Sequence, residues 1–193
     1  MIWKWAVPAV FIVLILIRSE VACPARSNKS IVSGPLQVNV PAGISYSHKT
    51  WHLDGERVLG RRDPPHFAVH ATHRSLPGSF VHIEEASWGS GSGYKEIESA
   101  EHIFYKSVPR LDSEWKPGVE SVAPQIVQLG EFPAYGCTWK EDERFERSFF
   151  IFVARPEAYI VAMRLPLGDI EKGKGSAYAS LLSVATDLTR AKR

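Results

Sequence analysis

The segment that most constrains the fold is Arg147 to Ala154 (RSFFIFVA), which is apolar at nearly every position. A strand with one solvent-facing side alternates apolar and polar residues, whereas a strand buried inside a sheet is apolar on both faces. A turn at Arg155-Pro156-Glu157 follows, and apolar residues then alternate from Tyr159 to Leu165. The pattern predicts two consecutive antiparallel strands, the first of them buried inside the sheet.

Elements on either side of this pair complete a fold class. Tyr135, Cys137 and Trp139 are two residues apart, so their side chains share one face of a preceding strand. Ser176 is suited to cap a helix, and apolar residues recur at helical spacing from Tyr178 to Leu188. The order strand, strand, strand, helix predicts an α+β domain, in which an antiparallel sheet is packed by a C-terminal amphipathic helix.

The earlier part of the domain is less regular. Leu36 to Val40 alternates like a half-buried strand, and Phe67 to Thr72 and Phe80 to Glu84 predict two strands of a hairpin. Residues 94–108 fit a helix or a strand equally well. Residues 109–125 contain three prolines and few apolar positions, which predicts a path over the surface.

The C-terminal third resembles a known group of domains. Residues 130–188 run from GEFPA through a hairpin and an aromatic-alternating strand to a closing helix, and this ending is similar to PsbP-like and DcrB-like extracytoplasmic domains. Leu36 to Ala42 (LQVNVPA) is similar to their opening strand, which leads into a proline turn. The resemblance implies an accessory or binding protein outside the cytoplasm and carries over no catalytic residue.

The N-terminus predicts export. Trp5 to Ile17 has no charged residue, yet it is shorter than the roughly 20 residues that span a membrane. Residues 1–25 are therefore interpreted as a signal peptide or a signal anchor, with any membrane contact made through residues 1–17. Residues 26–34 are interpreted as a linker and residues 35–193 as one globular domain, which is periplasmic, secreted or membrane-anchored.

The two cysteines leave further alternatives open. Val21-Ala22-Cys23 resembles the end of a lipoprotein box, in which Cys23 would be acylated. In an oxidising compartment Cys23 and Cys137 could instead form a disulfide, unless cleavage removes Cys23. Cys137 itself lies between aromatic residues, where a cysteine behaves as a small apolar side chain.

Charge and motifs exclude several functions. Lysine and arginine number 23 against 21 acidic residues, so no concentrated basic face is available for nucleic acid. The GSGSG segment at residues 89–93 lacks the lysine and spacing of a phosphate loop, and no cofactor is expected. The neighbouring acids Glu84 and Glu85 are interpreted as a solvated turn.

Three histidines form the candidate metal site. His66 and His70 share one face of a strand, and a hairpin would bring His82 beside His70, with Glu84 near. Zinc takes three or four converging ligands of this type. The alternative is that these histidines face solvent while the residues between them pack in the core.

Two tryptophans are candidates for partner binding. Trp88 precedes the glycine-rich segment, and Trp115 lies among the prolines of residues 109–125. Exposed aromatic side chains near loops often anchor a protein partner. Packing beneath long loops is the alternative for both.

These patterns favour a non-enzymatic binding or accessory protein of the cell envelope, which would serve a secretion or transfer apparatus through another envelope protein. One alternative is a metal-dependent extracytoplasmic hydrolase that uses the histidine cluster. A second is an immunity-type protein that blocks a toxin.

Overall fold

The computed structural model describes residues 27–51, 66–86, 96–107, 123–167 and 175–192. These residues form the predicted α+β fold of antiparallel strands with two helices. The elements are β1 (Lys29–Ser33), β2 (Leu36–Val40), β3 (Ser45–Trp51), β4 (His66–Thr72), β5 (Phe80–Ala86), α1 (Glu96–Ser107), β6 (Gln125–Leu129), β7 (Phe132–Lys140), β8 (Phe145–Ala154), β9 (Glu157–Pro166), α2 (Gly175–Thr186) and β10 (Thr189–Arg190).

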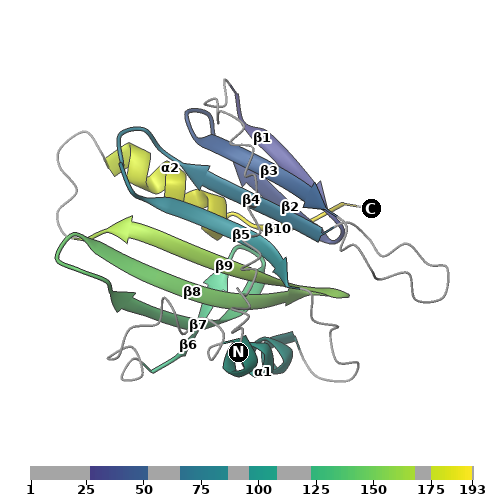
Figure 1. Cartoon of the computed structure of the whole chain (residues 1–193). Helices are drawn as coiled ribbons and strands as arrows, with labels where there is room; N and C mark the ends of the chain where they lie inside the picture. Colours follow the sequence, from purple (N-terminus) through teal and green to yellow (C-terminus); the bar gives the residue numbers. More distant parts are fainter. Residues whose placement is uncertain (1–26, 52–65, 87–95, 108–122, 168–174, 193) are drawn as a thin grey trace, which may run out of the picture.

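The strands form two sheets (Figure 1). The larger has seven strands in the order β3-β4-β5-β9-β8-β7-β6, and each neighbouring pair is antiparallel. The smaller has the order β1-β2-β10, so β2 lies between strands from the two ends of the domain. Strands β8 and β9 are paired inside the larger sheet, as the apolar run predicted.

One face of the larger sheet is closed by α2 and the smaller sheet. Phe152 lies at its centre, with its ring 4.9 Å from that of Phe132 and 5.2 Å from that of Tyr159. All three side chains are fully buried. From α2 this core takes Leu181, and from β2 it takes Val38. We call this side of the sheet the closed face.

The opposite face is covered by α1 on one side only. Helix α1 packs on β7 and β8, and a second apolar cluster forms between them. Within it Phe104 lies edge-on to Tyr135 and near Phe149. In Figure 1, α1 lies at the β6–β7–β8 side of the sheet, away from β3 and β4.

Three segments differ from, or add to, the sequence prediction. Residues 26–34, expected to be a linker, include β1, in which only Ile31 is buried, opposite Val38 of β2. A short, mostly polar edge strand has no periodic signal, because pairing rather than burial holds it. The ambiguous residues 94–108 contain helix α1, and residues 109–125, expected on the surface, end at the first residue of β6.

The predicted N-terminal signal peptide or anchor lies outside the described residues. Of the helices that the structure describes, neither is long and apolar enough to cross a membrane.

Candidate functional site

The part of the sheet that α1 does not cover forms the candidate site. On the α1 side of β4, β5 and β9 the larger side chains, such as His70, His82 and Arg164, are half-buried, whereas the apolar residues between them on the closed face are buried. On β3, Ser47 is half-buried and Lys49 is exposed on the same side as His70. The alternation follows from the pleat of a strand, which points successive side chains to opposite faces. We call this surface the open face; it comprises Ser47, Lys49, His70, Thr72, Phe80, His82, Glu84, Ile160, Ala162 and Arg164.

A row of side chains crosses the open face at the two histidines. Ser47 lies opposite His70 in the strand register, and His70 lies opposite His82. The two imidazole rings are 5.7 Å apart between centroids, and the ring of Phe80 is 5.4 Å from that of His70. The hairpin prediction therefore placed His82 correctly.

Glu84 joins this row from the same strand as His82. The Nε2 atom of His82 is 3.1 Å from Oε2 of Glu84, at hydrogen-bonding distance. Burial lowers the pKa of His70, and the charge that His82 takes on when protonated lowers it further. At neutral pH His70 is therefore a neutral imidazole, which can accept or donate a hydrogen bond or bind a metal.

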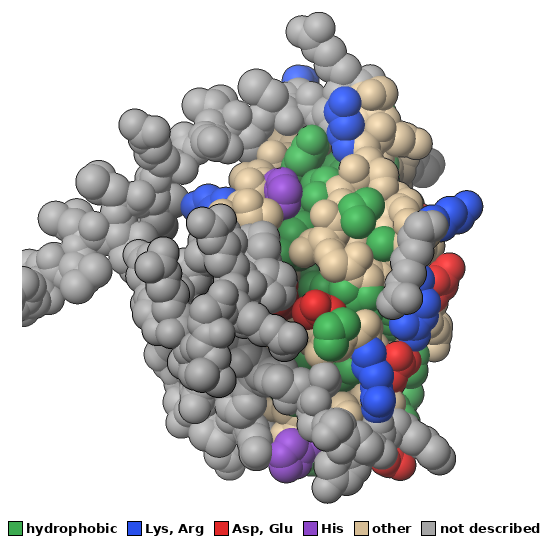
Figure 2. Space-filling view, turned by 90° about the vertical axis from the view of Figure 1, so that its right-hand side faces the viewer, with side chains coloured by type: hydrophobic (Ala, Val, Ile, Leu, Met, Phe, Trp, Pro, Cys, Tyr) green, Lys and Arg blue, Asp and Glu red, His purple; other side chains and the backbone are tan. Residues whose placement is uncertain are grey.

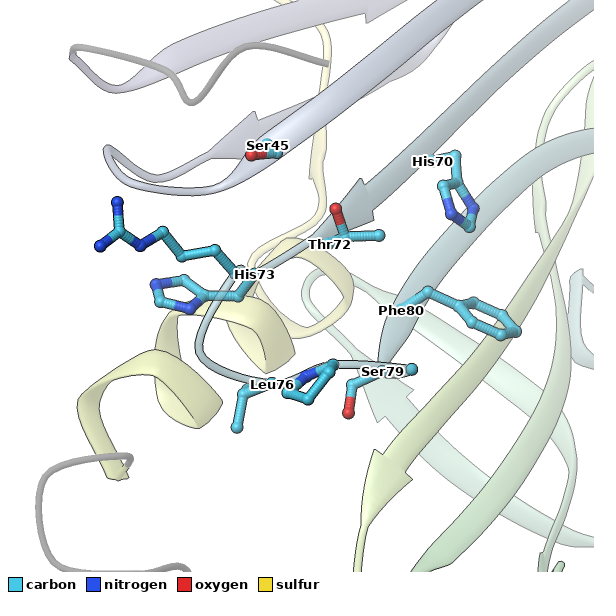
Figure 3. A pocket seen from close by; sticks show the side chains of 10 residues that line it. Ser45, His70, Thr72, His73, Leu76, Ser79 and Phe80 are labelled. Atoms are coloured by element: carbon cyan, nitrogen blue, oxygen red, sulfur yellow. The ribbon is translucent and has the colours of Figure 1, made fainter. Parts of the chain in front are cut away.

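A hollow of about 450 Å³ lies at one end of the open face, between strand residues and the β4–β5 turn. Figure 3 shows His70 and Phe80 on one side of the hairpin, whereas Leu76 of the turn points away from them. Leu76 belongs to the closed-face core. The turn is thus anchored on the closed face, and its polar side chains His73 and Arg74 border the hollow.

An ion network holds the border of the open face near this turn. Oε2 of Glu141 accepts hydrogen bonds from Nε of Arg147 at 2.8 Å and from Nε of Arg164 at 2.7 Å. Burial alone would raise the pKa of Glu141, but these two arginines outweigh it and lower that pKa. Arg164 also donates to the carbonyl of Gly78 at 2.8 Å, and its guanidinium lies 3.8 Å from the ring centre of Phe145.

The predicted metal site is only partly described. His70 and His82 are brought together, and His66 lies on β4 opposite Trp51, but its side chain is outside the described residues. Among the residues that the structure describes, no group of three or more His, Cys, Asp or Glu side chains is arranged to hold a metal ion. Metal binding by His66, His70 and His82 therefore stays a prediction.

Of the predicted cysteine and tryptophan sites, the structure describes only Cys137. Cys137 is a free thiol, buried beneath α1, and burial raises its pKa to about 11. A thiol with so high a pKa is a poor nucleophile at neutral pH. Cys23 lies outside the described residues, so its acylation or its disulfide with Cys137 stays a prediction. Trp88 and Trp115 also lie outside them.

A carboxyl pair on the closed-face side was missed in the sequence. Glu85 is on strand β5, not in a turn, and its register partner on β9 is Tyr159. Glu157 is two residues before Tyr159, so the two carboxyl groups are diagonal neighbours on one face. Burial and the nearby charge of Glu157 raise the pKa of Glu85 to about 7. Burial also raises the pKa of Glu157, and its Oε2 atom is buried without a hydrogen-bond partner.

This pair lies beside a second hollow of about 450 Å³, which Glu157 lines together with Gly34 and Arg190. Gly34 is in a left-handed conformation with φ of 54° and lies against the Glu157 carboxyl group. The hydroxyl of Tyr159 donates to the carbonyl of Ser33 at 3.2 Å, which ties the β1–β2 turn to the pair. Figure 2 views the molecule from the right of Figure 1, where basic and acidic side chains adjoin along one border.

Comparisons with known proteins add little to this picture. No family model matches the chain, and no match was found among curated proteins. A solved structure from Bacteroides thetaiotaomicron VPI-5482 is similar at 13% sequence identity and a TM-score of 0.46, and the match covers 87% of this chain. This chain spans about half the length of that protein, since the match covers 50% of it. The function must therefore be sought in the chain's own residues.

Proposed function

We propose that this chain is a non-enzymatic binding or accessory protein of the cell envelope, which residues 1–25 direct out of the cytoplasm. The observation that carries the proposal is the open face. It presents aromatic, imidazole, ammonium and carboxyl groups side by side on four strands of a sheet whose other face is closed. Mixed surfaces of this kind, with an aromatic residue such as Phe80 among polar groups, are typical of protein interfaces.

The shape of the surface favours binding over catalysis. An active site usually gathers its groups in a concave pocket that excludes water. The groups of the open face are instead spread over the pleat of β3, β4, β5 and β9, and the hollow at its end is open to solvent. A hydrogen-bonded sheet with a packed core behind it is well suited to position such groups for a partner that is itself folded.

The envelope assignment rests on the leader and on the resemblance of residues 130–188 to PsbP-like and DcrB-like domains. In this proposal the chain serves an apparatus for secretion or transfer. Its partner is another envelope protein that the open face contacts.

A cross-linking experiment in cells tests the binding proposal. A photo-reactive amino acid at Lys49, which is exposed on the open face, should capture a single partner in high yield. The same probe at Glu143, exposed on the β7–β8 turn, is the control and should not capture it. Adding Phe80→Ala to the Lys49 probe should weaken binding, and with it the yield at low concentration, about thirtyfold, since an aromatic anchor contributes about 2 kcal/mol. Equal capture at both positions, or none, would contradict the proposal.

The location is tested by the mass of the mature chain in separate fractions. A soluble extracytoplasmic form that lacks residues 1–25 supports a cleaved signal peptide. A membrane form at full mass supports the anchor, and a truncated form with added acyl mass supports acylation of Cys23. Recovery of the full-length chain in the cytoplasm alone would contradict the envelope proposal.

A metal-dependent hydrolase is the second candidate, and the proximity of His70, His82 and Glu84 favours it. Elemental analysis of the purified full chain would then find about one metal ion per chain, as a single built site requires. His70→Ala and His82→Ala should each abolish metal retention. His48→Ala is the control, because His48 lies on β3 beside Phe67 rather than on the open face. A chain free of metal would remove this candidate.

A further inference from the structure

Strand β6 is an edge that carries no protection against further pairing. In the part of the chain that the structure describes, β6 is the last strand of the larger sheet and pairs only with β7. Its sequence, QIVQL, has no charged residue and no proline. The opposite edge, β3, contains Lys49, and the edge strand β1 begins at Lys29. Lysine and proline are the usual means of blocking an exposed edge, so among the strand edges that the structure describes β6 is the one without a charged residue or proline.

An exposed apolar patch adjoins this edge. Ile126 on β6 is 65% exposed, and Tyr105 on α1 is 55% exposed. The two are linked by Tyr135, which lies opposite Ile126 in the register and whose hydroxyl is 3.0 Å from the hydroxyl of Tyr105. The rings of Tyr105 and Tyr135 are 5.9 Å apart between centroids. Apolar surface therefore continues from the strand edge onto the helix.

Acidic side chains border the patch. Glu98, Glu101, His102 and Tyr105 recur at helical spacing along one face of α1 and line a hollow of about 380 Å³. Tyr105 and Glu101 both hydrogen-bond Tyr135, and these bonds, with burial, raise the pKa of the Tyr135 hydroxyl. Tyr135 therefore lies between Glu101, which it hydrogen-bonds, and Ile126, its register partner. A ligand on the patch would meet apolar groups first and carboxylates beside them.

We propose that β6 accepts an extended basic segment of a partner protein as an additional strand, with apolar side chains on Ile126 and Tyr105 and Lys or Arg side chains facing Glu98 and Glu101. In strand addition the backbone hydrogen bonds supply affinity, and alternate side chains supply specificity. The ligand should therefore alternate apolar and basic residues and contain no proline. This inference goes beyond the open face, which lies on the other side of α1, and assigns a second binding site with its own partner chemistry.

A second copy of this chain is the less suitable occupant. Two β6 strands paired about a two-fold axis perpendicular to the sheet would place both α1 helices on the same face. Their acidic stripes would then approach each other across the new seam, and like charges in such positions are destabilising. A basic segment would instead place positive charges beside these carboxylates, and opposite charges attract.

A library of random decapeptides displayed on phage, selected against the purified full chain, tests the proposal. The expected consensus has Lys or Arg at alternate positions with Val, Ile or an aromatic residue between them. Ile126→Lys should weaken a selected peptide at least about tenfold, because it removes the central apolar contact and adds a repelling charge. Val32→Lys is the matched control: Val32 is 57% exposed on the edge strand β1, and its replacement should leave the affinity unchanged.

The charge component is tested separately. Glu101→Gln should weaken the same peptide about threefold at low ionic strength, and the difference should vanish in about 1 M salt, where screening is strong. Glu143→Gln on the β7–β8 turn is the control. Both Glu101→Gln and Ile126→Lys replace exposed side chains, so the fold should persist, and circular dichroism would check it.

Three results of the peptide selection would overturn the inference. They are the absence of any selected peptide, a consensus that is acidic or rich in proline, and equal binding by Ile126→Lys and the parent chain. A dimer of the parent chain in sedimentation that Ile126→Lys makes monomeric would also overturn it, in favour of a second copy. None of these results bears on capture at Lys49, so the binding proposal for the open face can fail or stand independently.

Discussion

The two faces of the seven-stranded sheet are stabilised in different ways. The closed face packs against α2 and the smaller sheet, with stacked aromatic rings at its centre. The face on the α1 side is covered by a helix only over β7 and β8. Over β3, β4, β5 and β9 it carries polar groups among scattered apolar ones, with hydrogen bonds and ion pairs at its border. The comparison separates two tasks within one sheet: the closed face supplies stability, and the other face can present polar groups without loss of the core.

The largest expected difference between the faces comes from two phenylalanines on β8. Phe152 is fully buried between two rings on the closed face, whereas Phe149 is 5% exposed beside α1. Phe152→Ala should lower the free energy of unfolding by about 5 kcal/mol and Phe149→Ala by about 3 kcal/mol, the upper and lower parts of the usual range for such truncations. Urea unfolding of the two variants measures both. Equal losses would show that the faces are packed equally well.

A glycine sharpens the comparison at the border of the closed face. Gly130 has a φ of 60°, and a Cβ atom there would lie 1.9 Å from the carbonyl oxygen of Leu188. Gly130→Ala should therefore lower the free energy of unfolding by about 3 kcal/mol. The alanine would be strained at this φ, and the backbone at Leu188 would also have to move. Gly43, with φ of 88° and open space around it, is the control, and Gly43→Ala should cost about 1 kcal/mol. Similar losses in thermal unfolding would mean that the contact with Leu188 yields easily.

The ion network at the border of the open face should have a smaller effect. Glu141→Gln removes the charge that Arg147 and Arg164 share, and we expect a loss of about 2 kcal/mol at neutral pH. Because the folded state lowers the pKa of Glu141, this contribution is present above its ordinary pKa of 4.5 and is lost as the pH falls below it. Unfolding at pH 7 and pH 3 measures it. Glu143→Gln on the same turn should change stability by less than about 0.5 kcal/mol, and an equal effect of both variants would contradict a specific network.

The carboxyl pair gives the smallest effect and the opposite sign. Glu85 keeps its proton in the folded state up to a pKa of about 7, whereas the unfolded chain releases it near 4.5. The folded state therefore loses stability as the pH rises through that window. Glu85→Gln should stabilise the fold by about 1 kcal/mol at pH 8, a value reduced for the partial exposure of the site and for the neighbouring Glu157 and Tyr159.

The control for that variant is Glu84→Gln, on the same strand but on the open face. It removes the charge beside His82 while keeping an acceptor oxygen for the imidazole, and it should not stabilise the fold at pH 8. Unfolding curves across the pH range would compare the two. If the free energy of unfolding of Glu85→Gln falls from pH 5 to pH 8 as steeply as that of the parent chain, Glu85 is not the group that titrates.

The sequence predicted those elements whose burial leaves a periodic signal. Strands β8 and β9 were evident from their apolar pattern, and α2 from its helical spacing. Strand β1 was not, because one buried residue, Ile31, leaves no period to detect. The ambiguity of residues 94–108 was resolved by α1, whose buried residues include Ala100, Ile103 and Phe104 on the side that meets the sheet.

The candidate site was predictable only where its residues lie on strands that follow each other in the sequence. His70 and His82 belong to consecutive strands, so a hairpin brings them together. Glu85 and Glu157 belong to β5 and β9, which are far apart in sequence and adjacent only through the strand order. The patch at Ile126 depends likewise on how α1 docks beside β7. Contacts between distant segments are not encoded in any local pattern, so sequence reasoning missed both the Glu85–Glu157 pair and the patch at Ile126.

The central position of β2 has a consequence for how the chain can be rewired. Strand β1 lies on one side of it and β10 on the other, so the first and last strands are separated by about 10 Å, two strand spacings. Arg190 lies opposite Leu36 and therefore level with Ser33, whereas Lys29 lies opposite Val40, four residues further along β2. A linker from residue 190 to residue 29 would therefore have to span about 17 Å. New ends could be opened at the exposed Pro77-Gly78 turn. Such a circular permutant would keep every strand pairing that the structure describes.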